Sequence, residues 1–224
     1  MGPLPGFAIG LEMEARQKKS LRFAFRRHYC IQPWTDFMEL HWGWNCQIYV
    51  TPVSPQEVCV AMISSSPKLR LDEALVEFPS LSDRLRNGQH SSGERGAITV
   101  NRTLQRVFRG RTVLAGDASG GVDAITGEGI GLAFPQTELL ADCLSTQNLP
   151  RYQRERRALI RRPALMAHLM LLLARHHRLR QRTLQAFHTR PRLFAGMLAM
   201  HVGAGSTTGY FANGLALGWN LLRA

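Results

Sequence analysis

Two glycine-containing turns on either side of a short loop constrain the fold of this chain more than any other sequence feature. The apolar run 111–115 leads directly into Gly116-Asp117. Eleven residues after Gly116, the turn Gly127-Glu128-Gly129 opens a segment of helical character that reaches about Leu144. This order predicts a crevice in which a strand end, a loop and a helix N-terminus converge.

The residues of this loop are suited to binding a cofactor. A carboxylate at Asp117 would lie outside the carboxyl edge of the strand, where open α/β sheets bind ligands, and could accept hydrogen bonds from sugar-like hydroxyls. The unpaired N–H groups at the helix start, with the positive end of the helix dipole, suit an electron-rich ring edge such as that of a reduced flavin. Asp123 is either a further cofactor ligand or a loop and capping residue.

The segment Val113–Leu144, VLAGDASGGVDAITGEGIGLAFPQTELLADCL, resembles the second FAD-binding motif of the p-hydroxybenzoate hydroxylase and geranylgeranyl reductase superfamily. The resemblance implies that Gly116 and Asp117 contact the ribityl chain of FAD. It also implies a helix start at the pyrimidine edge of the isoalloxazine ring, formed by Gly127, Glu128, Gly129 and Ile130. The form D-x-x-T-G-E-G-I is more similar to the reductase branch and its unassigned bacterial relatives than to the aromatic hydroxylases.

The resemblance implies an FAD-dependent oxidoreductase, either a reductase or a monooxygenase, with NAD(P)H as a candidate electron donor. Members of this family begin with a Gly-x-Gly-x-x-Gly turn for the ADP half of FAD. Residues 2–6 read GPLPG instead, and their prolines could not open a phosphate-binding helix. We therefore expect a chain that lacks the front part of the cofactor domain. The alternative is a non-catalytic relative that binds FAD too weakly to act and uses a basic apolar helix to contact a membrane surface or a partner.

The remaining pattern predicts an α+β fold. Four runs rich in aromatic and β-branched residues predict an antiparallel sheet, similar to the substrate-domain sheet of the same family. They are Leu21–Tyr29, Phe37–Trp42, Gln47–Pro52 and Glu57–Ser64. Residues 71–85 have helical spacing, with Pro79 expected to end or kink the helix. Ala97–Val100 and Arg111–Ala115 are expected to be further strands.

These elements divide the chain into four expected parts. An irregular segment covers 1–20, the substrate-domain sheet and helix cover 21–97, and the second FAD-binding motif covers 98–149 as the C-terminal part of a Rossmann-like domain. A C-terminal helical region covers 150–224. We expect its helix to continue almost to His188 with an interruption at Pro163, and we expect Pro135 to kink the helix that begins at Gly129.

The net charge of +12 is concentrated in the predicted C-terminal helical region. Its arginines lack the aromatic interleaving typical of nucleic-acid-binding segments, so a solvated basic face is expected and a nucleic-acid partner is not. Membrane contact is the stronger rival, because the apolar run 163–174 has arginines on both sides and is too short to span a bilayer. No secretory signal is visible, so a cytoplasmic location is expected, with peripheral membrane association left open.

The substrate class is open at this stage. A small molecule, aromatic or lipid-like, would suit the family, and sheet aromatics either line its cavity or simply pack the sheet. They are Trp34, Trp42, Trp44 and Tyr49. His28 and His41 show no sequence partner, so no catalytic acid or base is identified. The four cysteines show neither CxxC pairing nor a histidine spacing suited to zinc, so no metal site is expected.

Overall fold

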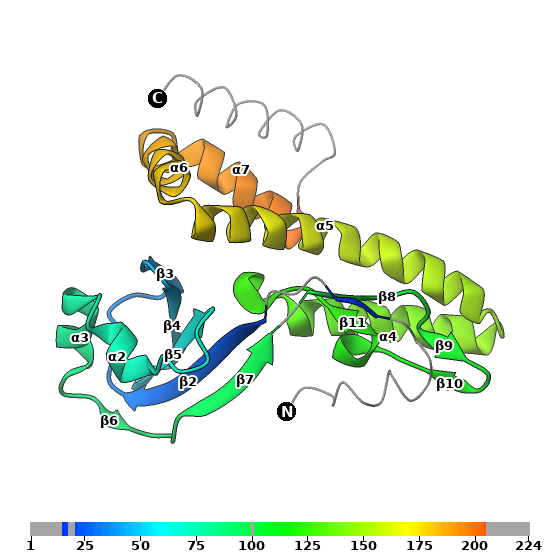
Figure 1. Cartoon of the computed structure of the whole chain (residues 1–224), viewed down its shortest axis with the longest axis horizontal. Helices are drawn as coiled ribbons and strands as arrows, with labels where there is room; N and C mark the ends of the chain where they lie inside the picture. The colour runs from blue at the N-terminus through cyan, green and yellow to red at the C-terminus, as the bar shows by residue number, and fades with distance from the viewer. Residues whose placement is uncertain (1–14, 18–20, 100, 205–224) are drawn as a thin grey trace. The chain divides into compact units, whose positions relative to one another are not determined.

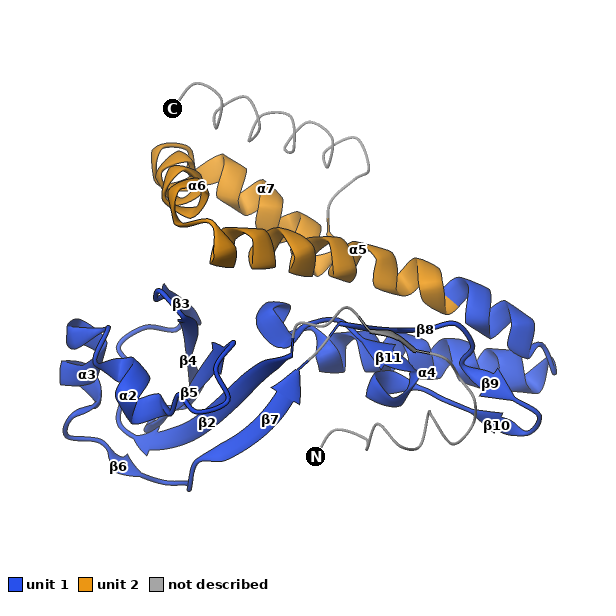
Figure 2. Ribbon diagram, in the orientation of Figure 1, with its two compact units in different colours: residues 1–155 blue, residues 156–224 orange. Residues whose placement is uncertain are grey.

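The computed structural model describes residues 15–17, 21–99 and 101–204. It is a mixed α+β protein, as the sequence predicted, and it divides into two compact units, 1–155 and 156–224 (Figure 2). The predicted irregular segment lies largely outside the described residues, as do Val100 and the end of the predicted C-terminal region.

The first unit contains a six-stranded antiparallel sheet (Figure 1). In spatial order its strands are β3 (Glu39–Trp42), β4 (Cys46–Ser54), β5 (Glu57–Ser64), β2 (Arg22–Cys30) and β6 (Gln89–His90), with β7 (Arg95–Thr99) also paired to β2. The four strands expected between residues 21 and 64 are therefore confirmed. Short connections that contain Pro, Gly and Asn separate runs with strong strand preference, which is why their ends are readable from sequence.

One face of this sheet carries the main hydrophobic core. Alternation along β4 turns Cys46, Ile48 and Val50 toward the core, and it turns Gln47 and Tyr49 to the opposite face. Helices α2 (Leu71–Leu75) and α3 (Pro79–Leu85) pack their apolar residues on the core face. Pro79 occupies the first turn of α3, where a missing N–H is tolerated, so it separates two short helices as the sequence predicted.

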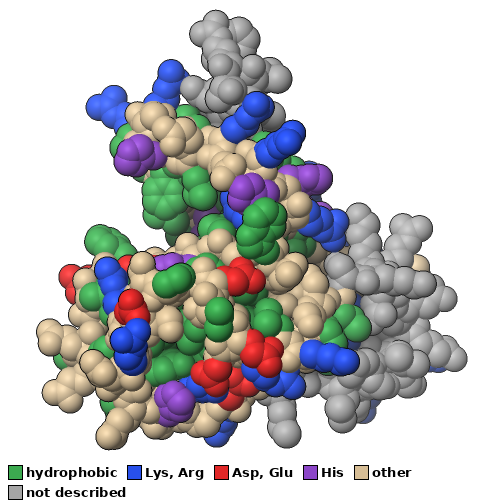
Figure 3. All heavy atoms as spheres, turned by 60° about the vertical axis from the view of Figure 1, so that its left-hand side comes forward, with side chains coloured by type: hydrophobic (Ala, Val, Ile, Leu, Met, Phe, Trp, Pro, Cys, Tyr) green, Lys and Arg blue, Asp and Glu red, His purple; other side chains and the backbone are tan. Residues whose placement is uncertain are grey.

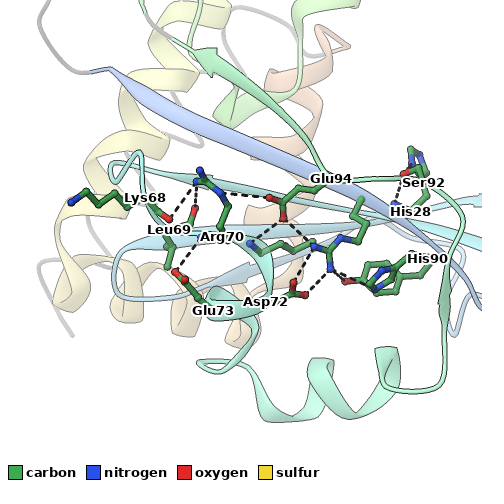
Figure 4. A network of polar contacts seen from close by, with 12 residues as sticks. His28, Lys68, Leu69, Arg70, Asp72, Glu73, His90, Ser92 and Glu94 are labelled. Carbon is green, nitrogen blue, oxygen red and sulfur yellow. Dashed lines mark hydrogen bonds and ion pairs between the residues drawn. The ribbon is translucent and has the colours of Figure 1, made fainter.

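A polar network around Arg27 joins the core face of the sheet to α2 (Figure 4). The Arg27 guanidinium donates to both carboxylate oxygens of Asp72, at 2.6 and 3.0 Å, and to Glu94 at 3.3 Å. Glu94 also accepts from the backbone N–H of Leu71 at 3.4 Å. The hydrogen bonds with Asp72 raise the pKa of Arg27, and the same bonds lower the pKa of Asp72. The network therefore fixes the start of α2 against β2.

The rest of the first unit is built around the predicted cofactor loop. A three-stranded sheet contains β1 (Ala15–Gln17), β8 (Arg102–Leu104) and β11 (Gly120–Gly121), and a hairpin contains β9 (Phe108–Arg109) and β10 (Thr112–Val113). Helix α4 (Gly129–Ser145) follows the loop. A second core contains Leu104, Val107, Leu114, Cys143 and Tyr152. The Tyr152 hydroxyl donates to the Leu114 carbonyl at 3.0 Å. This bond connects the first turn of α5 (Leu149–Arg175) to the segment that precedes Gly116.

The strand expected over Arg111–Ala115 is shorter than predicted. Only Thr112 and Val113 have strand pairing, and they pair antiparallel with β9. Beyond them the Leu114 N–H donates to the Val107 carbonyl at 2.8 Å, and the chain then turns at Gly116. The described residues therefore give this strand a hairpin partner rather than a place in an open parallel sheet, and the Rossmann-like assignment of 98–149 stays a prediction.

The second unit is helical. Helix α5 (Leu149–Arg175) enters it from the first unit and is followed by α6 (His177–Thr189) and α7 (Pro191–Val202). The expected interruption at Pro163 is wrong, because α5 continues through that residue and the helix breaks at His176, whose backbone is extended. An internal proline removes one backbone hydrogen bond, and a long helix can retain its remaining bonds. Pro135 also lies inside α4, and the kink expected there stays a prediction. None of the described helices is long and apolar enough to cross a membrane.

Replacing Arg27 by Ala should destabilise the first unit by about 1.5–3 kcal/mol, because charge-assisted hydrogen bonds at a buried guanidinium are lost. Urea unfolding measures the change. Since the folded pKa of Asp72 is lowered, the stabilising contribution is present at neutral pH and is lost as pH falls through that pKa.

Arg86→Ala is the matched control for this change. Its ion pair with Asp83 is exposed at both ends, so its loss should cost less than about 1 kcal/mol. An equal effect of the two substitutions would contradict the structural role given to Arg27.

Candidate active site

The loop between the two glycine turns has backbone angles that favour glycine. Gly116 has φ 53°, Gly120 has φ 106° and Gly127 has φ 70°. Side chains of L-residues rarely adopt such angles, so these positions let the chain reverse direction twice within a short stretch. Gly116 begins the 3₁₀ turn η1 (Gly116–Ser119), and Gly127 ends the 3₁₀ turn η2 (Ala124–Thr126). Both predicted turns are therefore present at the predicted residues.

Asp117 lies in η1 with its carboxylate exposed to solvent. Its backbone carbonyl accepts hydrogen bonds from the Arg102 guanidinium at 2.8 Å and from the Gly120 N–H. The Ser119 hydroxyl donates to the Gly116 carbonyl at 2.7 Å, which closes the same turn. The backbone of Asp117 is thus fixed by its neighbours, and its side chain is open to a ligand.

Asp123 is buried, unlike Asp117, and its carboxylate is used within the loop. The Arg22 guanidinium donates to its Oδ1 at 2.8 Å, with side chains only 7% and 2% exposed. The same oxygen accepts from the Ile125 N–H at 2.9 Å, which caps η2. The Asp123 N–H in turn donates to Asn101 Oδ1 at 2.7 Å. These contacts give Asp123 a structural role, and its contact with a cofactor stays a prediction.

Further contacts hold the loop on the sheet face opposite α2 and α3. The Tyr49 hydroxyl donates to the Ile125 carbonyl at 2.7 Å, and the Ala124 N–H donates to Thr99 Oγ1 at 2.8 Å. Burial raises the pKa of Tyr49, so its hydroxyl stays protonated and remains a donor at neutral pH. Strand register places Arg22 of β2 opposite Thr99 of β7, with both side chains on this same face. The loop is therefore anchored by three separate strands.

Sequence reasoning missed these anchors. The Arg22–Asp123 contact joins residues 101 positions apart, and the Tyr49–Ile125 contact joins residues 76 positions apart. Neither pair belongs to a local motif. The one available signal was an arginine and a tyrosine in strands otherwise rich in apolar residues, and it does not identify their partners.

Helix α4 begins at Gly129, where the sequence predicted it, with Glu128 as its half-buried N-cap. The Leu132 N–H donates to the Glu128 carbonyl at 2.9 Å, and this is the first hydrogen bond of the helix. The N–H groups of the three residues before Leu132 therefore have no acceptor within the helix. A Cβ atom added at Gly127, Gly129 or Gly131 would meet no atom of the described residues within 4 Å. Ile130 is 75% exposed. The helix start thus leaves the N–H groups of Gly129, Ile130 and Gly131 outside the hydrogen bonds of the helix, and its glycines place no side chain in front of an approaching ligand.

Three of the other candidate residues, Trp34, His41 and His28, have side-chain partners outside this loop. The Trp34 indole donates to Glu39 at 2.9 Å, and His41 Nε2 lies 2.9 Å from the same carboxylate. Burial alone would raise the pKa of Glu39, but the hydrogen bonds with Trp34 and His41 outweigh it and lower that pKa. His28 contacts Ser92 at 3.1 Å. Tyr49, by contrast, contacts the loop through its hydrogen bond to the Ile125 carbonyl.

Several solved enzyme structures, flavin-dependent halogenases among them, share this fold. The chain matches the flavin-dependent brominase Bmp2 with a TM-score of 0.68 at 13% identity, over 85% of this chain and 52% of the brominase. It matches the Diels-Alderase PyrE3 of pyrroindomycin biosynthesis with a TM-score of 0.66 at 16% identity, over 88% and 47%. It matches a geranylgeranyl bacteriochlorophyll reductase-like protein from Thermoplasma acidophilum with a TM-score of 0.53 at 17% identity, over 67% and 43%.

These likenesses show that the chain shares its fold with flavin-dependent enzymes such as the brominase. This chain spans about half the length of these structures or less. No family model matches the sequence, and no curated protein matches it. Because the neighbours include a brominase and a Diels-Alderase, the shared fold does not identify the reaction.

Replacing Arg22 by Met should destabilise the first unit by about 3–5 kcal/mol, because Asp123 would keep a buried charge without its partner. The double variant Arg22→Met/Asp123→Asn should cost less than the sum of the two single changes. Urea unfolding of all four proteins in the cycle measures the coupling.

Tyr49→Phe is the comparison variant, because Tyr49 also holds the loop on the sheet but through a neutral hydrogen bond. It removes one neutral hydrogen bond to the Ile125 carbonyl, and we expect a loss of about 1 kcal/mol. Additive effects of the Arg22 and Asp123 changes would contradict the assignment of this ion pair as the anchor of the loop.

Proposed function

We propose that residues 116–131 hold the flavin half of FAD in an oxidoreductase. The observation that carries the proposal is the combination of an exposed carboxylate at Asp117 with backbone N–H groups that lie outside the helical hydrogen bonds at the start of α4. Both belong to one loop that is fixed by the buried Arg22–Asp123 pair. A preorganised donor array of this kind stabilises negative charge on a ligand without reorganising.

Each residue of the loop has a distinct part in this proposal. Gly116 makes the turn that presents Asp117, and the Asp117 carboxylate accepts hydrogen bonds from the ribityl hydroxyls. The absence of a side chain at Gly127 and Gly129 lets a flat ring approach the backbone closely. The N–H groups of Gly129 and Ile130 donate toward the pyrimidine edge, where the positive end of the α4 dipole favours negative charge. Glu128 and Ile130 border the same edge.

Bound FAD would supply hydride transfer or oxygen activation, and NAD(P)H is the proposed source of electrons. The chain's own contribution is to orient the ring and to stabilise its charge. We place the substrate, a small aromatic or lipid-like molecule, over the sheet face that carries Tyr49, because the cofactor loop is anchored to that face. Reductase and monooxygenase activities both fit this arrangement.

Filling the space at the helix start should block FAD without unfolding the protein. Gly129→Val adds a side chain where no atom of the described part of the chain lies within 4 Å and where φ is not positive, so stability should change by less than about 0.5 kcal/mol. Titration of FAD fluorescence should show quenching with the unaltered chain and binding at least about tenfold weaker with the variant.

Gly93→Val is the matched control for this experiment. Gly93 also has open space around its Cβ position and no positive φ, and it lies outside the loop. Its affinity for FAD should equal that of the unaltered chain. Equal binding by all three proteins would overturn the proposed site, and no binding by the unaltered chain would favour the non-catalytic alternative.

Removing the proposed ribityl contact should also weaken binding. Asp117→Ala deletes an exposed carboxylate whose side chain is not used in a hydrogen bond among the described residues, so the fold should be retained. We expect FAD affinity to fall about 10- to 100-fold, the range for hydrogen bonds to a charged group. The same fluorescence titration measures this loss, and unchanged affinity would remove Asp117 from the site.

A further inference from the structure

The net charge of the chain belongs almost entirely to its helical unit. Residues 156–224 contain eleven arginines and no lysine, aspartate or glutamate, which gives +11 of the total +12. Residues 1–155 contain seventeen basic and sixteen acidic residues and are close to neutral. A segment that is so strongly basic and has no internal acidic partners produces a positive potential that attracts an anionic surface.

The same unit exposes apolar side chains in an ordered pattern. Along α5, the exposed residues recur at helical spacing and share one face. They are Arg157, Arg161, Leu165, Leu169, Leu172 and Arg175. The three leucines are 55%, 37% and 43% exposed. This α5 face therefore has leucines at its centre and arginines toward both ends.

Exposed apolar residues also recur along α7. Phe194, Leu198 and Val202 follow one another at intervals of four residues and are 52%, 48% and 65% exposed. In Figure 3, basic and histidine side chains are interspersed with apolar ones in the upper part of the molecule, below the grey atoms at the top. A single exposed leucine is ordinary on a protein surface. The exposed apolar residues of α5 and α7 instead form repeated patterns.

The two properties together identify the chemistry of the partner. Transfer of leucine side chains from water to an apolar layer is favourable, and so is the approach of arginine side chains to negative charge. The interface of an anionic bilayer offers both, with acyl chains below a layer of phosphates. A nucleic-acid backbone offers the negative charge without the apolar layer. Lipid is therefore favoured over nucleic acid.

We propose that the α5 face lies on the surface of a lipid bilayer rich in anionic headgroups. Leu165, Leu169 and Leu172 enter the boundary of the acyl chains, and Arg161 and Arg175 contact lipid phosphates. This surface binding is independent of the proposed flavin site, because it uses residues of the second unit alone. Binding to the bilayer would place the protein close to a lipid-like substrate.

Co-sedimentation of the full chain with vesicles tests the proposal. Vesicles that contain phosphatidylglycerol should bind the chain, and vesicles of phosphatidylcholine alone should bind it far less. Arg161→Gln/Arg175→Gln should weaken binding to the anionic vesicles about 25-fold, since each arginine near such a surface contributes about fivefold. Leu165→Gln/Leu172→Gln should weaken it at least about tenfold, because the acyl contact is lost.

Arg106→Gln/Arg111→Gln is the matched control. It removes the same charge from two exposed residues of the first unit, and binding should be retained within about twofold. Equal losses in the control and in Arg161→Gln/Arg175→Gln would overturn the assignment to the α5 face. Indifference to the leucine changes, equal binding to both vesicle types, or binding to duplex DNA without binding to vesicles would overturn the proposal.

Discussion

The buried ion pair between Arg22 and Asp123 holds the loop between the two glycine turns against the sheet. It joins the first residue of β2 to a loop 101 positions later in the chain, and both side chains are almost wholly removed from solvent. Either charge alone would carry a desolvation cost of several kcal/mol, so the two segments are favoured together and disfavoured apart. Since Asp123 also caps η2, the same carboxylate shapes the loop and positions it. The turns at Gly116 and Gly127 lie on either side of this point.

The strand alternation gives the two faces of the sheet different tasks. The face that carries Ile48 and Val50 packs against α2 and α3 and supports the core, and Arg27 reinforces it through Asp72. The opposite face carries Arg22 and Tyr49, which bind the loop. A cofactor held by the loop would therefore rest on a rigid support, which favours precise placement of its reactive ring. The proposed substrate position follows from the same geometry.

The sequence predicted those features that depend on local chemistry. Proline, glycine and asparagine separate the strands between residues 22 and 64, and Gly116 and Gly127 have the positive φ angles that such turns need. The start of α4 at Gly129 was likewise readable. The anchors of the loop were not, because Arg22 and Tyr49 meet it only after the sheet has folded. The interruption expected at Pro163 was wrong for a related reason: local propensity favours a break there, and α5 as a whole continues to Arg175.

The role of the loop in flavin binding can be tested directly by amide hydrogen exchange of the full chain with and without FAD. We expect slower exchange with FAD at the backbone amides of Asp117 to Gly121 and of Glu128 to Leu132. We expect little change in α2, which packs on the core face of the sheet. Protection confined to other segments, or an exchange pattern that saturating FAD leaves unaltered, would contradict the proposal that this loop is a flavin site.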